Sequence, residues 1–130
     1  MSADNLVMQS YGRCCASASF FDDFYTRFLE SSPEIRAKFV TTDMTQQKHL
    51  LRHGILNLVL HARGMPDTKL RALGESHSRH RMDIKPHLYD FWVDALMATV
   101  AVHDAAFDTN IGMAWREVLT KGIEVIQRHY

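Results

Sequence analysis

The sequence predicts an all-helical protein that folds as a single domain over residues 1–130. Apolar side chains recur at i, i+3, i+4 and i+7 along most of the chain, which is the spacing of amphipathic helices. Strand-like alternation never runs for long, and the chain has no Asn-Gly hairpin turn. A length of 130 residues with 46% hydrophobic residues is enough for one core. The three prolines, Pro33, Pro66 and Pro86, fall between the predicted helices, where proline is tolerated.

The first half of the chain is expected to hold two helices, a short turn and a long helix. The first helix covers about residues 4–16. The second lies in "SASFFDDFYTRFLESSP", and its apolar face carries Phe21, Tyr25, Phe28 and Leu29. Pro33 begins the short turn "PEIRAKF", and the loop "TTDM" contains N-cap candidates. The long helix is "TQQKHLLRHGILNLVLHA", with one face formed by Gln47, Leu51, Ile55, Leu58 and Ala62.

Three further helices are expected in the second half. After the break from Gly64 to Pro66, Asp67 is expected to cap the short helix "DTKLRALGESHS", in which Leu70, Leu73 and His77 share one face. Pro86 opens the next helix, which carries Tyr89, Trp92, Leu96, Thr99 and His103 at helical spacing. Asp108 or Thr109 caps the last helix, in which the repeating side chains are Ile111, Trp115, Val118, Leu119, Gly122 and Ile126.

The overall charge argues against several classes of protein. Fifteen basic residues balance fifteen acidic ones, whereas a nucleic-acid-binding protein usually carries a basic stripe. No apolar run is long enough to span a membrane, and the first residues lack the pattern of a secretory signal, so a cytoplasmic location is expected. Cys14 and Cys15 are adjacent on a predicted helix and are expected to be two reduced thiols.

Three histidines in "LGESHSRHRMDIKPHLY" raise the question of a metal or cofactor site. His77 shares the apolar face of its helix, which separates it from a solvated histidine. His77 and His80 could supply two zinc ligands, but no cysteine pair, His-Glu-x-x-His motif or suitably spaced carboxylate completes such a site. A di-iron bundle is disfavoured because no Glu-x-x-His motif recurs on two helices. A haem needs one imidazole and an apolar slot, which the aromatic second helix, Phe39, Leu51, Ile55 and Trp92 could build.

Several segments, in this order, resemble one known family. "DDFYTRFLESSPEIRAKF" is similar to that family's stretch from a distal tyrosine to a phenylalanine that wedges the haem, and "LGESH" to its segment ending in the proximal histidine. "PHLYDFW" and "AWREVL" resemble the beginning of the next helix and a part of the last one. Nearly the whole chain thus resembles a bacterial globin, of the group that includes single-domain haemoglobins and the globin part of flavohaemoglobins. The resemblance implies a globin fold, about six to eight helices that sandwich a haem.

The resemblance also implies the cofactor and the site residues. The cofactor is haem b (iron protoporphyrin IX), and its iron is bound by His77, the proximal histidine. Tyr25 is the distal tyrosine, Phe39 the wedge, and Tyr89 the tyrosine that approaches the proximal imidazole. The full set of expected cofactor-binding residues is Tyr25, Phe39, Gln47, Leu51, His77, His80, Arg81, Ile84, Tyr89 and Trp92. Within this set His80 and Arg81 are candidates for contacts with the haem propionates, as are Arg79 and Lys85 outside it, while His87 is expected to be solvated.

The register of the distal helix leaves two alternatives. Counting from the Leu51 and Ile55 face places Gln47 over the iron, which requires a shorter loop after Phe39 than in flavohaemoglobins. Otherwise His49 lies over the iron with His53 one turn further on, and either could close the sixth coordination position. We favour Gln47, because the alternative puts a histidine where the pocket needs an apolar group.

The expected function is reversible binding of oxygen, or of another diatomic gas such as nitric oxide or carbon monoxide. The flavohaemoglobins place a glutamate near the proximal pair, and the equivalent position here is Tyr130. This departure argues against the alternatives of a nitric oxide dioxygenase or a peroxidase-like enzyme, either of which would need a separate reductase. A haem-based gas or redox sensor is a further alternative.

Overall fold

The computed structural model describes residues 2–130, and over that range it contains α-helices and no strands. Its helices are α1 (Ala3–Cys15), α2 (Phe20–Ser31), α3 (Pro33–Lys38), α4 (Met44–Ala62), α5 (Thr68–Ser76), α6 (Leu88–His103) and α7 (Thr109–Gln127). The all-α prediction is confirmed, and each predicted helix is present with small shifts at its ends. The predicted short turn after Pro33 is the helix α3. No helix among the described residues is long and apolar enough to cross a membrane.

Side-chain caps explain where several helices begin. A carboxylate oxygen of Asp43 accepts hydrogen bonds from the backbone N–H groups of Thr45 and Gln46, which starts α4. Asp108 accepts from the N–H of Ile111 at 2.8 Å and starts α7. Asp67 occupies the N-cap position of α5, as predicted, but its side chain forms no capping hydrogen bond. Its carboxylate instead forms an ion pair with a guanidinium one turn later in α5.

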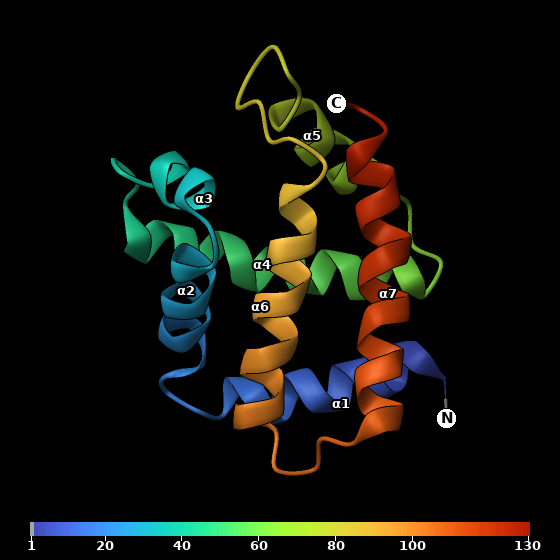
Figure 1. Ribbon diagram of the computed structural model, residues 1–130. Coiled ribbons are helices and arrows are strands. Elements are labelled where there is room, and N and C mark those ends of the chain that lie inside the picture. Colours follow the sequence, from blue (N-terminus) through green and yellow to red (C-terminus); the bar gives the residue numbers. More distant parts are fainter. Residues whose placement is uncertain (1) are drawn as a thin grey trace.

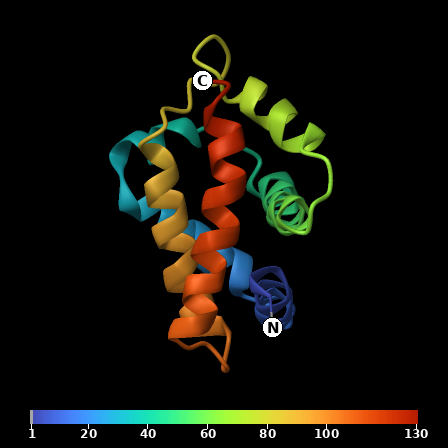
Figure 2. The same ribbon diagram turned by 90° about the vertical axis from the view of Figure 1, so that its right-hand side faces the viewer.

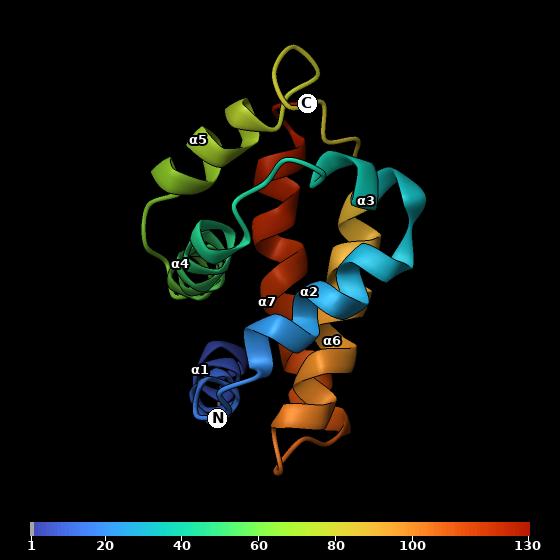
Figure 3. The same cartoon turned by 90° about the vertical axis from the view of Figure 1, so that its left-hand side faces the viewer.

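The arrangement is centred on α6 and α7, which lie side by side and run in opposite directions (Figure 1). Helices α1, α4 and α5 pack on α7, and α2 packs on α6. Figure 2 shows α1 and α4 nearly end-on, both to the same side of α7. Seen from the opposite side in Figure 3, α4 and α5 lie to one side of α7, and α2, α3 and α6 lie to the other. The predicted site residues therefore come from both sides of α7.

Two glycines allow α5 and α4 to approach α7 closely. A Cβ at Gly74 would lie 2.7 Å from the carbonyl oxygen of Ile126, and a Cβ at Gly122 would overlap the side chain of Leu58. A side chain at either position would push the helices apart. The close approach at Gly74 fixes the end of α5, and therefore the start of the segment that carries His77.

A buried polar cluster joins α1 to the α6–α7 end of the molecule. Asp104, only 2% exposed, accepts hydrogen bonds from the Ser10 hydroxyl at 2.6 Å and from the Arg13 guanidinium. The indole N–H of Trp115 donates to the same Ser10 oxygen at 2.9 Å. The Arg13 and Ser10 hydrogen bonds hold the pKa of Asp104 below its usual range against the opposing effect of burial. The cluster therefore contains an ionised, fully hydrogen-bonded carboxylate.

Candidate functional site

His77 lies directly after α5, as its C-cap residue, and its backbone N–H donates to the carbonyl of Leu73 at 3.0 Å. The ring is half-buried, and its Nδ1 lies 2.8 Å from the hydroxyl oxygen of Tyr89 on α6. Burial lowers the pKa of His77 and raises the pKa of Tyr89, so the imidazole and the phenol are both neutral near pH 7. Since this hydrogen bond occupies Nδ1, the imidazole can offer its Nε2 to a ligand.

The chain after His77 forms a loop that returns to the same point. The N–H of Ile84 donates to the carbonyl of His77 at 2.9 Å, and the N–H of Asp83 donates to that of Ser78 at 2.9 Å. Asp83 has φ +52°, a left-handed conformation that aspartate adopts more readily than most residues. The Lys38 ammonium at the end of α3 donates to the carbonyls of Met82 and Asp83, both at 3.0 Å. This loop therefore holds Ile84 near the imidazole and ties α3 to it.

Tyr25 lies on α2, which is on the opposite side of α7 from α5 (Figure 3). It is only 5% exposed, and its hydroxyl donates to the backbone carbonyl of Gln47 on α4 at 3.3 Å. Burial raises the pKa of Tyr25 to about 12, so the phenol keeps its proton at neutral pH. Gln47 is half-buried, and Leu51, one turn further along α4, is buried. Tyr25, Gln47 and Leu51 thus lie on the inward side of the α2–α4 region.

His49 and His53, the alternative distal residues, lie elsewhere on α4. Both side chains are exposed, and the His53 ring bonds to the backbone carbonyl of His49 rather than entering the core. The helix places their positions on the side opposite Leu51. Of the candidate distal residues, Gln47 therefore faces inward, whereas His49 and His53 face outward.

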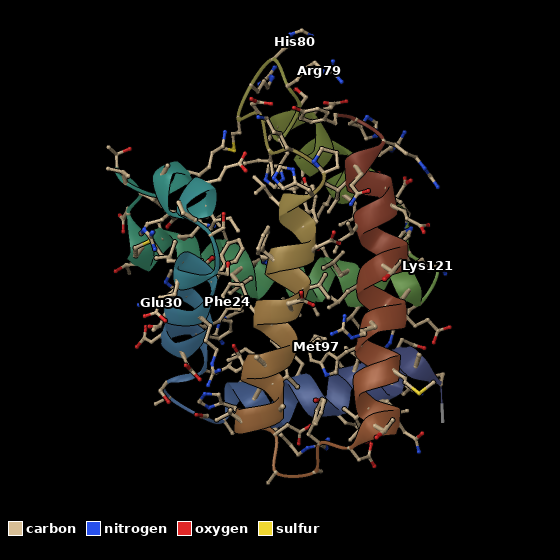
Figure 4. All side chains as sticks on the ribbon, in the orientation of Figure 1. Phe24, Glu30, Arg79, His80, Met97 and Lys121 are labelled. Atoms are coloured by element: carbon tan, nitrogen blue, oxygen red, sulfur yellow. The ribbon has the colours of Figure 1, made fainter. Side chains whose placement is uncertain are left out.

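Aromatic side chains link the tyrosine to α3 and α6. The ring of Phe39 lies 6.2 Å from that of Tyr25 and 5.9 Å from that of Phe28, measured between centroids. Phe24 packs between α2 and α6, with its centroid 6.1 Å from that of Trp92 (Figure 4). Edge-to-face pairs of this kind fix ring orientation and add to the stability gained from burial.

Several apolar side chains around this region are incompletely covered. The side chains that pack against the buried core but are themselves only half-buried include Phe39, Ile84, Tyr89 and Trp92. Leu73, one turn before His77, is 36% exposed, whereas its neighbour Leu70 on the predicted apolar face is buried. The face that Leu70, Leu73 and His77 share is therefore only partly covered. Apolar surface is left beside the imidazole.

The charged residues predicted near the haem edge lie on the α5–α6 loop and are exposed. Figure 4 shows Arg79 and His80 at the end of the molecule. The Arg79 guanidinium lies over the ring of Tyr130 at 4.8 Å and donates to its backbone carbonyl. Arg81 and His80 form no side-chain hydrogen bond within residues 2–130. His87, expected to be solvated, is exposed and also lies 2.9 Å from a carboxylate oxygen of Glu34 on α3.

Tyr130, which the sequence analysis aligned with a glutamate of the flavohaemoglobins, forms contacts with the loop after His77. Its hydroxyl donates to the Asp83 carboxylate at 2.5 Å, which joins the C-terminus to the loop after His77. The bond holds the pKa of Asp83 below its usual range. Within residues 2–130 no carboxylate forms a hydrogen bond with the Tyr89 hydroxyl or the His77 ring.

Some contributors to the site were missed by the sequence analysis. Lys38, Asp83 and Tyr130 together close the loop that carries Ile84, although none was predicted to shape the site. These contacts join residues more than forty positions apart in the sequence. No periodic pattern could have indicated them, and only the left-handed turn at Asp83 has a weak residue-type signal.

Comparison with known proteins gives a family and one solved structure. The globin family model matches residues 22–126. A crystal structure of a protein from Pseudomonas aeruginosa PAO1, described as structurally highly homologous to a human haemoglobin, is 64% identical to this chain. The match covers 99% of this chain and 98% of that one, with a TM-score of 0.98. None of the curated proteins matches. Since the family model spans most of the chain, which folds as the globin resemblance predicted, this protein belongs to the globin family.

Proposed function

We propose that this protein binds a b-type haem through His77 and reversibly binds oxygen, or another diatomic gas, between the iron and Tyr25. The observation that carries the proposal is the state of His77. Its ring is half-buried and neutral, its Nδ1 is bonded to the Tyr89 hydroxyl, and its Nε2 makes no hydrogen bond within residues 2–130. An imidazole that binds a metal commonly has its second nitrogen hydrogen-bonded in this way, which fixes the tautomer and the ring orientation.

The neighbouring side chains fit a large, flat, apolar group. Leu73 and Ile84 leave apolar surface beside the imidazole, and Phe39 and Trp92 do so further away. Such incompletely covered side chains gain stability when an apolar surface covers them. Lys38, Lys85 and Arg81 lie on the adjoining loop and α3, where cations can pair with propionates.

A haem held in this way supplies the iron at which a diatomic ligand binds. The residues on the opposite side determine how long the ligand stays. Tyr25 is a neutral, buried phenol whose O–H can donate a hydrogen bond to a partly negative ligand, and Gln47 carries an amide donor on the same side. Leu51 is buried and lacks a polar atom, so it excludes water from the donors.

The proximal contacts favour binding over oxygen activation. When Nε2 is the ligating nitrogen, Nδ1 carries the proton, and this N–H donates a hydrogen bond to the oxygen of Tyr89. A neutral phenol draws this proton less strongly than a carboxylate would, so the imidazole remains a weaker electron donor. We therefore place reversible gas binding ahead of nitric oxide dioxygenase or peroxidase chemistry.

The test is the absorption spectrum of the purified protein in its ferric, ferrous and carbon monoxide forms. The wild-type protein should show a haem Soret band that shifts with carbon monoxide. His77→Ala should lose or strongly alter the band, while His87→Ala, a substitution of an exposed histidine, should retain it. No haem band after addition of haemin, or a normal band in His77→Ala, would refute the proposal.

A further inference from the structure

Two histidines on the outer surface of α4 have no part in the proposed haem site. His49 and His53 are four residues apart, so their side chains emerge on one face of the helix, one turn apart. Both are exposed, while Leu51 between them is buried on the opposite face. The sequence pattern His-x-x-x-His on a helix brings two imidazoles within reach of one metal ion.

The hydrogen bond of His53 determines which of its nitrogens is available. Its Nδ1 lies 2.9 Å from the backbone carbonyl oxygen of His49. A carbonyl oxygen only accepts hydrogen bonds, so Nδ1 is the donor and carries the proton. In the neutral ring the lone pair is then on Nε2, which is exposed together with the rest of the side chain. An imidazole held through Nδ1–H to a backbone carbonyl is the arrangement usual among metal-binding histidines.

The cations nearest to this pair in the sequence are directed toward α2. The Lys48 ammonium forms an ion pair with Asp22, and the Arg52 guanidinium lies 4.7 Å from the centroid of the Phe21 ring. The ring of His49 forms no hydrogen bond within residues 2–130, so its nitrogens are also available. Neither imidazole is thus occupied by another side chain.

No group of three or more His, Cys, Asp or Glu residues in the described part of the chain could hold a metal ion. A closed structural zinc site, which needs four protein ligands, is therefore not formed. Two imidazoles with water or a small chelator in the other positions suit copper(II) and nickel(II), which accept tetragonal nitrogen and oxygen coordination. We propose that His49 and His53 form a two-ligand surface site for a divalent transition-metal ion, with copper(II) bound most strongly.

The site can be tested with the copper(II) complex of iminodiacetate, a neutral complex that leaves positions for two imidazoles. Calorimetric titration of the haem-loaded protein at neutral pH should show one bound complex per chain. His49→Gln and His53→Gln should each weaken binding at least about tenfold, because one imidazole can no longer act together with the other. His80→Gln and His87→Gln, which alter other exposed histidines, should leave the affinity unchanged.

A stability measurement gives an independent readout. The complex should raise the denaturant midpoint of the wild-type protein, because the unfolded chain does not hold the two rings one turn apart. The rise should disappear in either α4 variant. Wild-type affinity in His49→Gln or His53→Gln, or loss of binding in both loop variants, would overturn the proposal. If the protein does not bind haem, the same titration is made on the purified protein alone, because both rings lie on the outer face of α4 and the proposal does not rest on the haem site.

Discussion

Replacement of Tyr25 by phenylalanine tests the distal half of the proposed site with the smallest possible change. The substitution removes one hydroxyl and keeps the ring, which packs against Phe24 and Phe39. In the wild-type structure the Tyr25 hydroxyl donates one long hydrogen bond, 3.3 Å, to the backbone carbonyl of Gln47. Such a weak bond can be exchanged at low cost for a bond to a ligand that carries negative charge.

The expected magnitude follows from the setting of the hydroxyl. Tyr25 is 5% exposed, so the donor acts with little competition from water. A hydrogen bond contributes about 0.5–1.5 kcal/mol between neutral groups and about 1.5–3 kcal/mol when one partner is charged. An intermediate value of about 1–2 kcal/mol corresponds to oxygen dissociation about 5 to 30 times faster in Tyr25→Phe. Carbon monoxide gains less charge than oxygen, so its dissociation should change less.

The assay is stopped-flow displacement of oxygen from the ferrous protein by excess carbon monoxide. Tyr11→Phe is a matched control, because Tyr11 is also buried and its hydroxyl also donates to an α4 carbonyl, that of Arg52, at 3.2 Å. The control should release oxygen at the wild-type rate. An unchanged rate in Tyr25→Phe, or an equal acceleration in Tyr11→Phe, would refute the distal role of Tyr25.

Four further outcomes are expected. Gln47→Leu should speed oxygen release whereas His49→Leu should not, and the opposite result in the same displacement assay would move the helix register to His49. Asp104→Ala should lower the free energy of unfolding by about 2–4 kcal/mol because it leaves the buried Ser10 hydroxyl without its acceptor, while the exposed Asp94→Ala should cost less than about 1 kcal/mol. The folded pKa of Asp104 lies below 3.8, so its contribution to the free energy of unfolding is fully present above that pH. As the pH falls further, the difference in free energy of unfolding between wild type and Asp104→Ala, measured by denaturant titration, should shrink. In the haem-free protein the folded pKa of His77 lies below 6.5, so the unfolded chain binds more protons. The free energy of unfolding should therefore fall as the pH drops through 6.5, with a smaller fall in His77→Gln.

The helices could be predicted because each one has a strong local pattern. In α2 the spacing of Phe21, Tyr25 and Phe28 defines one buried face, and in α7 the spacing from Ile111 to Ile126 does the same. Caps such as Asp43 and Asp108 are equally local, because the carboxylate and the N–H that it accepts from are two or three residues apart. Short-range geometry of this kind is contained in the order of the residues.

The details of the site depend on contacts that no local pattern records. Leu73 lies on an apolar face but is not covered, because α5 packs on α7 through Leu70 and Gly74 instead. The Ser10–Asp104 bond spans 94 positions in the sequence, and a lone aspartate at a helix end gives no sign of it. The family resemblance indicated Tyr25 and His77 as a pair, but periodicity alone would have left both as ordinary core residues.

The C-terminal residue links the proximal geometry to the proposed function. The hydroxyl of Tyr130, which the resemblance aligns with a glutamate of the flavohaemoglobins, donates to Asp83 in the loop after His77. That loop also supplies the N–H of Ile84 to the carbonyl of His77, so the tyrosine helps hold the imidazole in place without adding negative charge to it. If His77 binds an iron as proposed, an imidazole fixed in this way, with only a neutral phenol on Nδ1, would increase the electron density on the iron little. Such a proximal side, together with the proposed donors Tyr25 and Gln47, is consistent with the proposed reversible binding of a gas rather than its activation.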